Sequence, residues 1–77
     1  MPTLVRLLDC TLSMYAADHL PPHFHVRLHD GREALVQILG LVVLRSSQCS
    51  RRELAAALAW AGANQTLLDA RWKELNP

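Results

Sequence analysis

The sequence predicts a small α+β domain of two layers, in which a mostly antiparallel sheet of about four strands is followed by two C-terminal helices packed on one face. Two observations lead to this fold class. Short runs with strand patterns fill the first half of the 77-residue chain, and capped, alanine-rich helical patterns fill the second half. The length and the composition, 51% hydrophobic and 19% charged, predict a single globular domain over residues 1–77.

The first two predicted strands are short apolar runs, residues 3–8 and 11–16, with residues 9–10 as a tight turn between them. Two adjacent prolines then interrupt regular structure. Pro22 lacks a backbone N–H, and Pro21 disfavours helical angles at the residue before it. We therefore expect a rigid, irregular segment between the second and third strands.

The third predicted strand, residues 23–29, has an alternating pattern with two distinct faces. Successive side chains of a strand point to opposite sides of the sheet. The apolar side chains are therefore expected beneath the helices, and the polar side chains on the uncovered face. The apolar set is Phe24, Val26 and Leu28, and the polar set is His23, His25, Arg27 and His29.

The fourth predicted strand, residues 32–38, is expected to pair with the third through a three-residue loop, residues 29–31. This register places Val26 opposite Ala34 and brings the apolar side chains of both strands onto one face. A register shifted by one residue would exchange the two faces. Gly31 is then expected at the left-handed position that such loops require.

One more short strand is expected over residues 41–44, and two helices complete the chain. Ser50 and Glu53 have the spacing of a capping box, which predicts a helix start at this point. Asn64 or Thr66 is expected to cap the second helix. The predicted inward-facing side chains are Leu54, Leu58 and Ala61 on the first helix and Leu68, Trp72 and Leu75 on the second.

The charge excludes a protein that attracts nucleic acid over its whole surface. A net charge of +1 is too small for a strong electrostatic footprint over the whole domain. Arg45, Arg51 and Arg52 form the one local basic cluster that a nucleic acid could use. Arginines in this position more often form the solvated start of a helix.

The expected location is the cytoplasm, with no membrane partner. No apolar run approaches the roughly 20 residues that span a bilayer, and Arg6 and Asp9 come too early for the apolar core of a secretion signal. In the cytoplasm, Cys10 and Cys49 are expected to be reduced thiols that pack as small apolar side chains.

Several stretches together resemble a known bacterial family, the domain of unknown function 4160. They are MPTLVR, DHLPPHFHV and REALVQI, with tryptophans at positions 60 and 72. The resemblance runs from residue 1 to about residue 75, and PPHFH is its most specific motif. It implies that the chain is encoded beside another small protein, with which it forms a toxin–antitoxin-like module. Asn64 stands where the family usually carries a histidine, so any chemistry of that histidine is absent here.

The histidine-rich stretch predicts a candidate metal site. His23 and His25 leave the same face of a strand about 7 Å apart at the backbone, which lets two imidazoles converge on one ion. A third ligand would come from His19, Asp18 or His29. The candidate set is His19, His23 and His25, with a divalent ion such as zinc, which needs at least three protein ligands. No other cofactor is expected.

The same face could instead carry acid–base chemistry without a metal. His23 and His25 would act as base and acid near neutral pH. Arg27 would hold a phosphate with its planar guanidinium group, and Tyr15 would join them if the second strand pairs with the third. These residues would make the chain a histidine-dependent ribonuclease, with RNA as its partner.

A third interpretation is structural, in which His19 and His23 hydrogen-bond backbone carbonyls around the prolines. Whether the chain is an enzyme is left open by its residues. We expect a binding component first, whose partner is the product of the adjacent gene, with a homodimer as the alternative. A small core and an exposed sheet edge both favour association.

Overall fold

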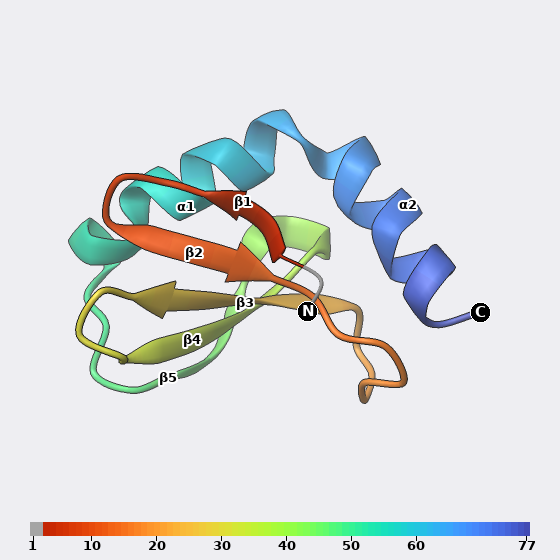
Figure 1. Cartoon of the computed structure of the whole chain (residues 1–77), viewed down its shortest axis with the longest axis horizontal. Coiled ribbons are helices and arrows are strands. Elements are labelled where there is room, and N and C mark those ends of the chain that lie inside the picture. Colours follow the sequence, from red (N-terminus) through yellow and green to blue (C-terminus); the bar gives the residue numbers. More distant parts are fainter. Residues whose placement is uncertain (1–2) are drawn as a thin grey trace.

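The computed structural model describes residues 3–77 as a two-layer α+β domain (Figure 1). Met1 and Pro2, which begin the MPTLVR stretch, lie outside the described residues. Five antiparallel strands form one sheet in the order β1-β2-β3-β4-β5, and two helices follow; each strand overlaps one of the five segments predicted as strands. The strands are β1 (Thr3–Arg6), β2 (Cys10–Ser13), β3 (His23–Leu28), β4 (Glu33–Gln37) and β5 (Val43–Ser46), and the helices are α1 (Arg51–Ala63) and α2 (Gln65–Leu75). The predicted fold class is confirmed.

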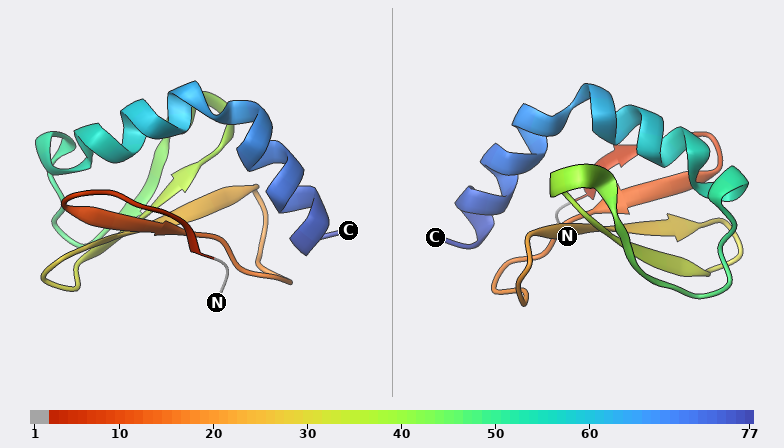
Figure 2. Two further views of the ribbon diagram at one scale, coloured as in Figure 1. Left: turned by 45° about the horizontal axis from the view of Figure 1, so that its top comes forward. Right: turned by 180° about the vertical axis from the view of Figure 1, so that it is seen from behind.

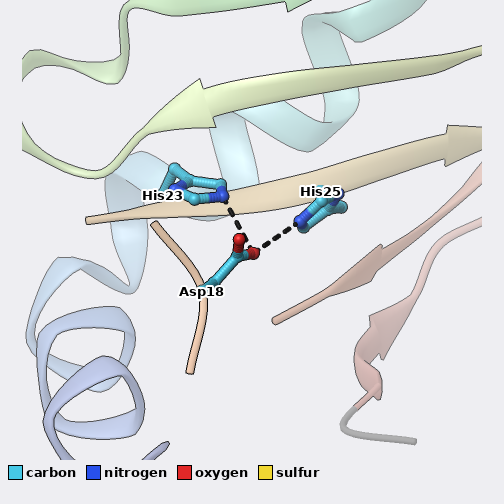
Figure 3. Close-up of side chains that lie close together, drawn as sticks. All are labelled: Asp18, His23 and His25. Carbon is cyan, nitrogen blue, oxygen red and sulfur yellow. Dashed lines mark hydrogen bonds and ion pairs between the residues drawn. The ribbon is translucent and has the colours of Figure 1, made fainter. Parts of the chain in front are cut away.

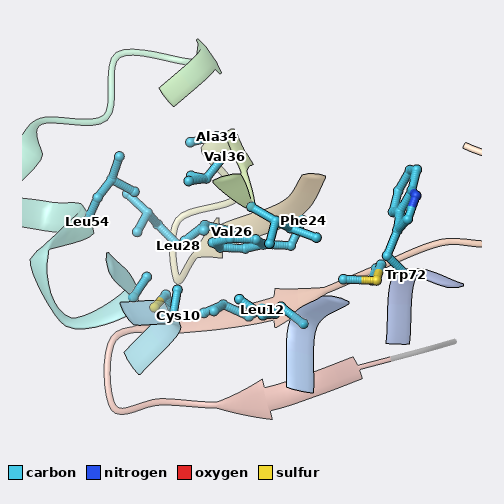
Figure 4. Packing of buried hydrophobic residues seen from close by; sticks show 14 residues of the cluster. Cys10, Leu12, Phe24, Val26, Leu28, Ala34, Val36, Leu54 and Trp72 are labelled. Atoms are coloured by element: carbon cyan, nitrogen blue, oxygen red, sulfur yellow. The ribbon is translucent and has the colours of Figure 1, made fainter. Parts of the chain in front are cut away.

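The two helices form an arch over one face of the sheet, and α2 descends beside the end of the sheet where β3 begins (Figures 1 and 2). The inward side chains of the central strands and of both helices meet in one apolar core (Figure 4). It consists of Cys10, Leu12, Met14, Phe24, Val26, Leu28, Ala34, Val36, Ile38, Leu54, Ala57, Ala61, Leu68 and Trp72.

The two faces of β3 are largely as predicted. Its three apolar side chains are buried beneath the helices, Arg27 is exposed, and His25 is partly buried. The expectation that His23 lies on the uncovered face is wrong, because its side chain is fully buried. Residue 23 begins the strand at the end of the sheet that α2 reaches, and the Trp72 ring covers it there, 5.4 Å away between centroids.

The hairpin between β3 and β4 has the predicted register. Val26 pairs with Ala34. The Leu28 N–H donates to the Arg32 carbonyl at 2.8 Å, and the Gly31 N–H donates to the Leu28 carbonyl at 3.0 Å. Gly31 has a φ of +93°, which is the left-handed conformation expected for it. The three-residue loop and the role of its glycine are confirmed.

Two strands, β2 and β5, are shifted along the chain relative to the predicted ranges, whereas β1, β3 and β4 lie within theirs. The prediction that Cys10 lies in a turn is wrong: it is buried in β2 and pairs with Leu28, since its small apolar side chain belongs to the core. The last strand comes two residues later than expected. A 3₁₀ turn occupies residues 39–41, where Gly40 has a φ of +76°, and this turn delays the strand.

The capping box at the start of α1 is confirmed. The Glu53 N–H donates to Ser50 Oγ at 3.1 Å, and the Ser50 N–H donates to Glu53 Oε1 at 3.0 Å. Asn64 precedes α2 as predicted, but its side chain does not cap that helix; its Nδ2 donates back to the Trp60 carbonyl at 2.7 Å and closes α1 instead. Neither described helix is long and apolar enough to cross a bilayer.

Candidate functional site

Three polar side chains converge at the start of β3: Asp18, His23 and His25 (Figure 3). Oδ2 of Asp18 lies 3.0 Å from Nε2 of His23 and 3.1 Å from Nε2 of His25. One ligand atom from each residue lies within 4.8 Å of the other two. The histidines are two positions apart on β3, and Asp18 belongs to the loop before that strand. We call these three residues the Asp18 cluster.

His23 is the innermost member of the Asp18 cluster. Its Nδ1 lies 2.8 Å from the carbonyl oxygen of Pro21. A carbonyl oxygen only accepts hydrogen bonds, so Nδ1 carries a proton and donates it there. The segment around the two prolines thus sets the orientation of the ring, and Nε2 faces Asp18.

His25 is the member nearest the solvent, with 18% of its side chain exposed. The Tyr15 ring meets the His25 ring edge-on, at 4.7 Å between centroids and 83° between planes. Nδ1 of His25 lies 3.7 Å from Oε1 of Glu33 on the neighbouring strand. The predicted approach of Tyr15 to the histidines is therefore present, because β2 pairs with β3.

Asp18 is held in place by the far end of the chain. Its backbone N–H donates to Oδ1 of Asn76 at 2.9 Å. Nδ2 of Asn76 in turn donates to the carbonyl oxygens of Tyr15 and Trp72, both at 3.3 Å. Asn76 thereby ties the loop that carries Asp18 to the last turn of α2.

The pKa of Asp18 lies below its ordinary value. Partial burial alone would raise this pKa, but the hydrogen bond from His25 and the backbone N–H of His19 lower it by more. The charges of His23 and His25 act in the same direction. Asp18 is therefore an ionised carboxylate at neutral pH.

The contact between Nε2 of His23 and Oδ2 of Asp18 requires a cation, because the neutral His23 ring has no proton to donate there. A neutral His23 ring has one proton, which Nδ1 donates to Pro21, so Nε2 then presents only a lone pair. This lone pair faces an ionised oxygen of Asp18 at 3.0 Å. Two acceptors repel at this distance, so the contact needs either a second proton on His23 or a metal ion bound to both atoms.

The other two histidines lie outside the Asp18 cluster. The His19 side chain is 64% exposed; its Nε2 lies 3.8 Å from Oδ1 of Asp18, and its ring stacks on His23 at 4.7 Å between centroids. His29 lies in the loop after β3, where its Nε2 donates to the Leu8 carbonyl at 2.6 Å. Of the predicted metal set, the structure therefore brings His23 and His25 together with Asp18, and His19 flanks them.

A groove of about 400 Å³ lies on the uncovered face of the sheet. Tyr15, His25 and Arg27 line it together, with Arg6 and Glu33 beside them. Arg27 thus shares a surface with His25, as the alternation of β3 predicts. His23 does not line the groove, so only two of the three predicted catalytic side chains face it.

Sequence reasoning named Asp18 only as one of three alternatives for a third ligand, and it did not identify Asn76. Asp18 and Asn76 are 58 positions apart. No pattern of neighbouring residues connects two positions so distant, and the contact depends on where α2 ends. The histidine–proline stretch itself was the signal that located the cluster.

The comparisons with known proteins identify the family. A family model described as domain of unknown function 4160 matches residues 10–73, which is most of the chain and includes the whole Asp18 cluster. No curated protein and no solved structure matches the chain. The resemblance carried by the PPHFH motif is therefore confirmed: the chain belongs to the family of the domain of unknown function 4160.

Proposed function

We propose that the chain is the binding component of a two-protein, toxin–antitoxin-like module of bacteria, and that it acts in the cytoplasm by contact with the product of the adjacent gene. The observation that carries the proposal is an apolar surface segment, residues 39–44, at the turn into β5. Six large hydrophobic side chains are exposed among the described residues, and three belong to this segment. Leu39 is 79% exposed, Val42 51% and Leu44 41%.

Clustered exposed hydrophobic side chains are typical of interaction surfaces, whereas isolated ones are common on any protein. The segment also reaches a sheet edge, because β5 is the last strand of the sheet that the described residues form. The outer side of an edge strand offers backbone groups to a further strand. Since a domain of this size has little core of its own, covering this segment with a partner would stabilise the pair.

The proposal is tested by co-purification with the product of the adjacent gene. Burial contributes about 1.5–3 kcal/mol for each large apolar side chain, so removing even one weakens binding about tenfold or more. We expect capture to be lost when Leu39, Val42 and Leu44 are all changed to Ser. The matched control changes the other three exposed side chains, Leu8, Leu20 and Leu67, to Ser and keeps capture.

Two results would contradict this proposal. The first is that the wild-type chain does not co-purify with the product of the adjacent gene. The second is that the control variant loses capture while the variant of residues 39–44 keeps it. Light scattering of the chain by itself distinguishes a homodimer. If the variant of residues 39–44 abolishes self-association and leaves capture unchanged, the segment is an interface between copies and the proposed contact is wrong.

A second candidate function, cleavage of RNA, is favoured by the groove on the uncovered face. His25 lines this groove beside two guanidinium groups, those of Arg6 and Arg27. Guanidinium groups hold phosphates by paired hydrogen bonds, and an imidazole close by can transfer a proton. We expect RNA degradation and growth arrest to be lost in His25→Ala and kept in His19→Ala, whose side chain lies outside the groove. Unchanged activity in a folded His25→Ala protein would rule out the ribonuclease.

A further inference from the structure

We propose that the Asp18 cluster is a mononuclear site for a divalent transition-metal ion of the zinc class, bound by Nε2 of His23, Nε2 of His25 and Oδ2 of Asp18. This site goes beyond the proposed function, because contact through residues 39–44 requires no metal. Two imidazoles and one carboxylate are a ligand set that such ions take in proteins, and three protein ligands leave a position for water.

The separations between the ligand atoms suit one ion. Bonds of about 2.0–2.1 Å in a tetrahedral arrangement place neighbouring ligand atoms roughly 3.3 Å apart. Oδ2 of Asp18 lies 3.0 Å from Nε2 of His23 and 3.1 Å from Nε2 of His25. All three atoms already lie within 4.8 Å of one another.

The tautomer of His23 is the one that a metal ligand needs. A histidine that binds metal through one nitrogen usually donates its other N–H to a carbonyl or carboxylate. Nδ1 of His23 does this to the Pro21 carbonyl at 2.8 Å. Nε2 is left with its lone pair directed at Asp18, and a metal ion placed there removes the conflict between these two acceptors.

The other two ligands have orienting partners as well. Oδ1 of Asp18 accepts from the His19 N–H at 2.9 Å, which leaves Oδ2 for the ion. Nδ1 of His25 faces the Glu33 carboxylate at 3.7 Å. The hydrogen bond from His19 holds Asp18 in place before any ion binds, which reduces the entropy lost on binding.

The cluster is also accessible. Asp18 and His25 keep 17% and 18% of their side chains exposed, whereas His23 is fully enclosed. An ion can therefore enter from the side of Asp18 and His25 and keep a water ligand there. The alternative occupant of the same place is a proton, which would make His23 an imidazolium ion paired with Asp18. A metal-bound nitrogen carries no proton, so the two occupants exclude each other.

The test uses tag-free protein stripped with a chelator and titrated with Zn²⁺ by calorimetry and by thermal unfolding. We expect one equivalent of Zn²⁺ to bind and to raise the unfolding midpoint, and excess chelator to reverse the rise. Co²⁺ in place of Zn²⁺ should give visible absorption with nitrogen and oxygen ligands. Because His23 is buried and its removal threatens the fold, the variants are His25→Ala and Asp18→Ala, for which we expect affinity to fall roughly 100-fold or more.

The matched controls are His19→Ala and His29→Ala, which remove the two histidines outside the cluster and should bind Zn²⁺ like the wild type. The proposal is overturned if Zn²⁺ leaves the midpoint of the wild-type protein unchanged. It is also overturned if the folded His25→Ala protein binds as well as the wild type, or if the controls lose binding. Capture of the adjacent gene's product is measured separately, so a failed metal site and a failed partner contact give different results.

Discussion

At the scale of single residues, the four polar side chains that alternate along residues 23–29 differ in how deeply they are buried. His23, His25, Arg27 and His29 alternate along one stretch, yet His23 is fully buried, His25 is partly buried, and Arg27 and His29 are exposed. The gradient arises because the ring of Trp72 and the proline segment cover only the start of β3. His23 is buried, and both of its ring nitrogens contact polar atoms, so it is part of the core as well as a candidate ligand.

The burial of His23 leads to the first prediction. His23→Ala in the presence of chelator should lower the free energy of unfolding by about 2–4 kcal/mol, because it leaves a cavity and removes a partner of the Asp18 carboxylate. His19→Ala, which removes an exposed ring from the loop before β3, should change the free energy of unfolding by less than about 0.5 kcal/mol. Urea unfolding of both variants measures the difference. Equal effects would show that the burial of His23 contributes nothing to stability.

At the scale of elements, turns and helix ends follow from local chemistry. Ser50 and Glu53 satisfy each other's backbone N–H groups at the start of α1. Gly31 takes a left-handed conformation that fixes the register of β3 and β4. Each of these features depends on residues within a few positions of one another, which explains why the sequence predicts them correctly.

Substitution of alanine for glycine at two positions should change the stability of the folded protein in opposite directions. Gly31→Ala meets no neighbouring atom, but it places a Cβ at a φ of +93° and should destabilise by about 1–2 kcal/mol. Gly62→Ala lies in α1, where the new Cβ makes an ordinary contact with Leu41 at 3.7 Å, so it should stabilise by up to about 1 kcal/mol. Thermal unfolding should show a lower midpoint for Gly31→Ala and a higher midpoint for Gly62→Ala than for the wild type. A stabilised Gly31→Ala protein would contradict the left-handed loop.

At the scale of the whole molecule, one arginine joins the sheet to the helical layer. Arg32, which follows the β3–β4 loop, donates from Nε to Oδ2 of Asp30 at 2.8 Å and from Nη1 to the Gln48 carbonyl at 2.9 Å. Both Nη atoms also bind the carboxylate of Glu53 in the first turn of α1. The guanidinium group of Arg32 thus joins the β3–β4 loop, the segment between β5 and α1, and the first turn of α1.

This junction predicts how stability depends on pH. The hydrogen bonds from the Arg32 side chain and the Ser50 backbone lower the pKa of Glu53 from its ordinary 4.5 to about 2. A carboxyl group whose pKa is lower in the folded state stabilises that state above its ordinary pKa, and this contribution is lost as the pH falls. The unfolding midpoint should therefore drop between about pH 5 and pH 2.

Glu53→Gln isolates the charge, because glutamine can keep the capping box. Its unfolding midpoint should lie below that of the wild type at neutral pH, and the gap should close towards about pH 2. The gap should also shrink at high salt, since the pair is exposed. Asp69→Asn, a change at an exposed position of α2, should follow the wild-type curve. A gap that stays constant with pH would contradict the role of this ion pair.

The succession of elements along the chain, the register of the β3–β4 hairpin, the inward faces and the capped start of α1 were determined by the sequence alone. Period-two alternation, turn glycines and capping residues act through sterics and hydrogen bonds over a few positions. Only the tertiary structure decided that His23 is buried and that Asp18 is the third member of the cluster. Both depend on where α2 comes to rest, because Trp72 covers the ring and Asn76 holds the Asp18 loop. No local pattern encodes contacts between the two ends of a chain.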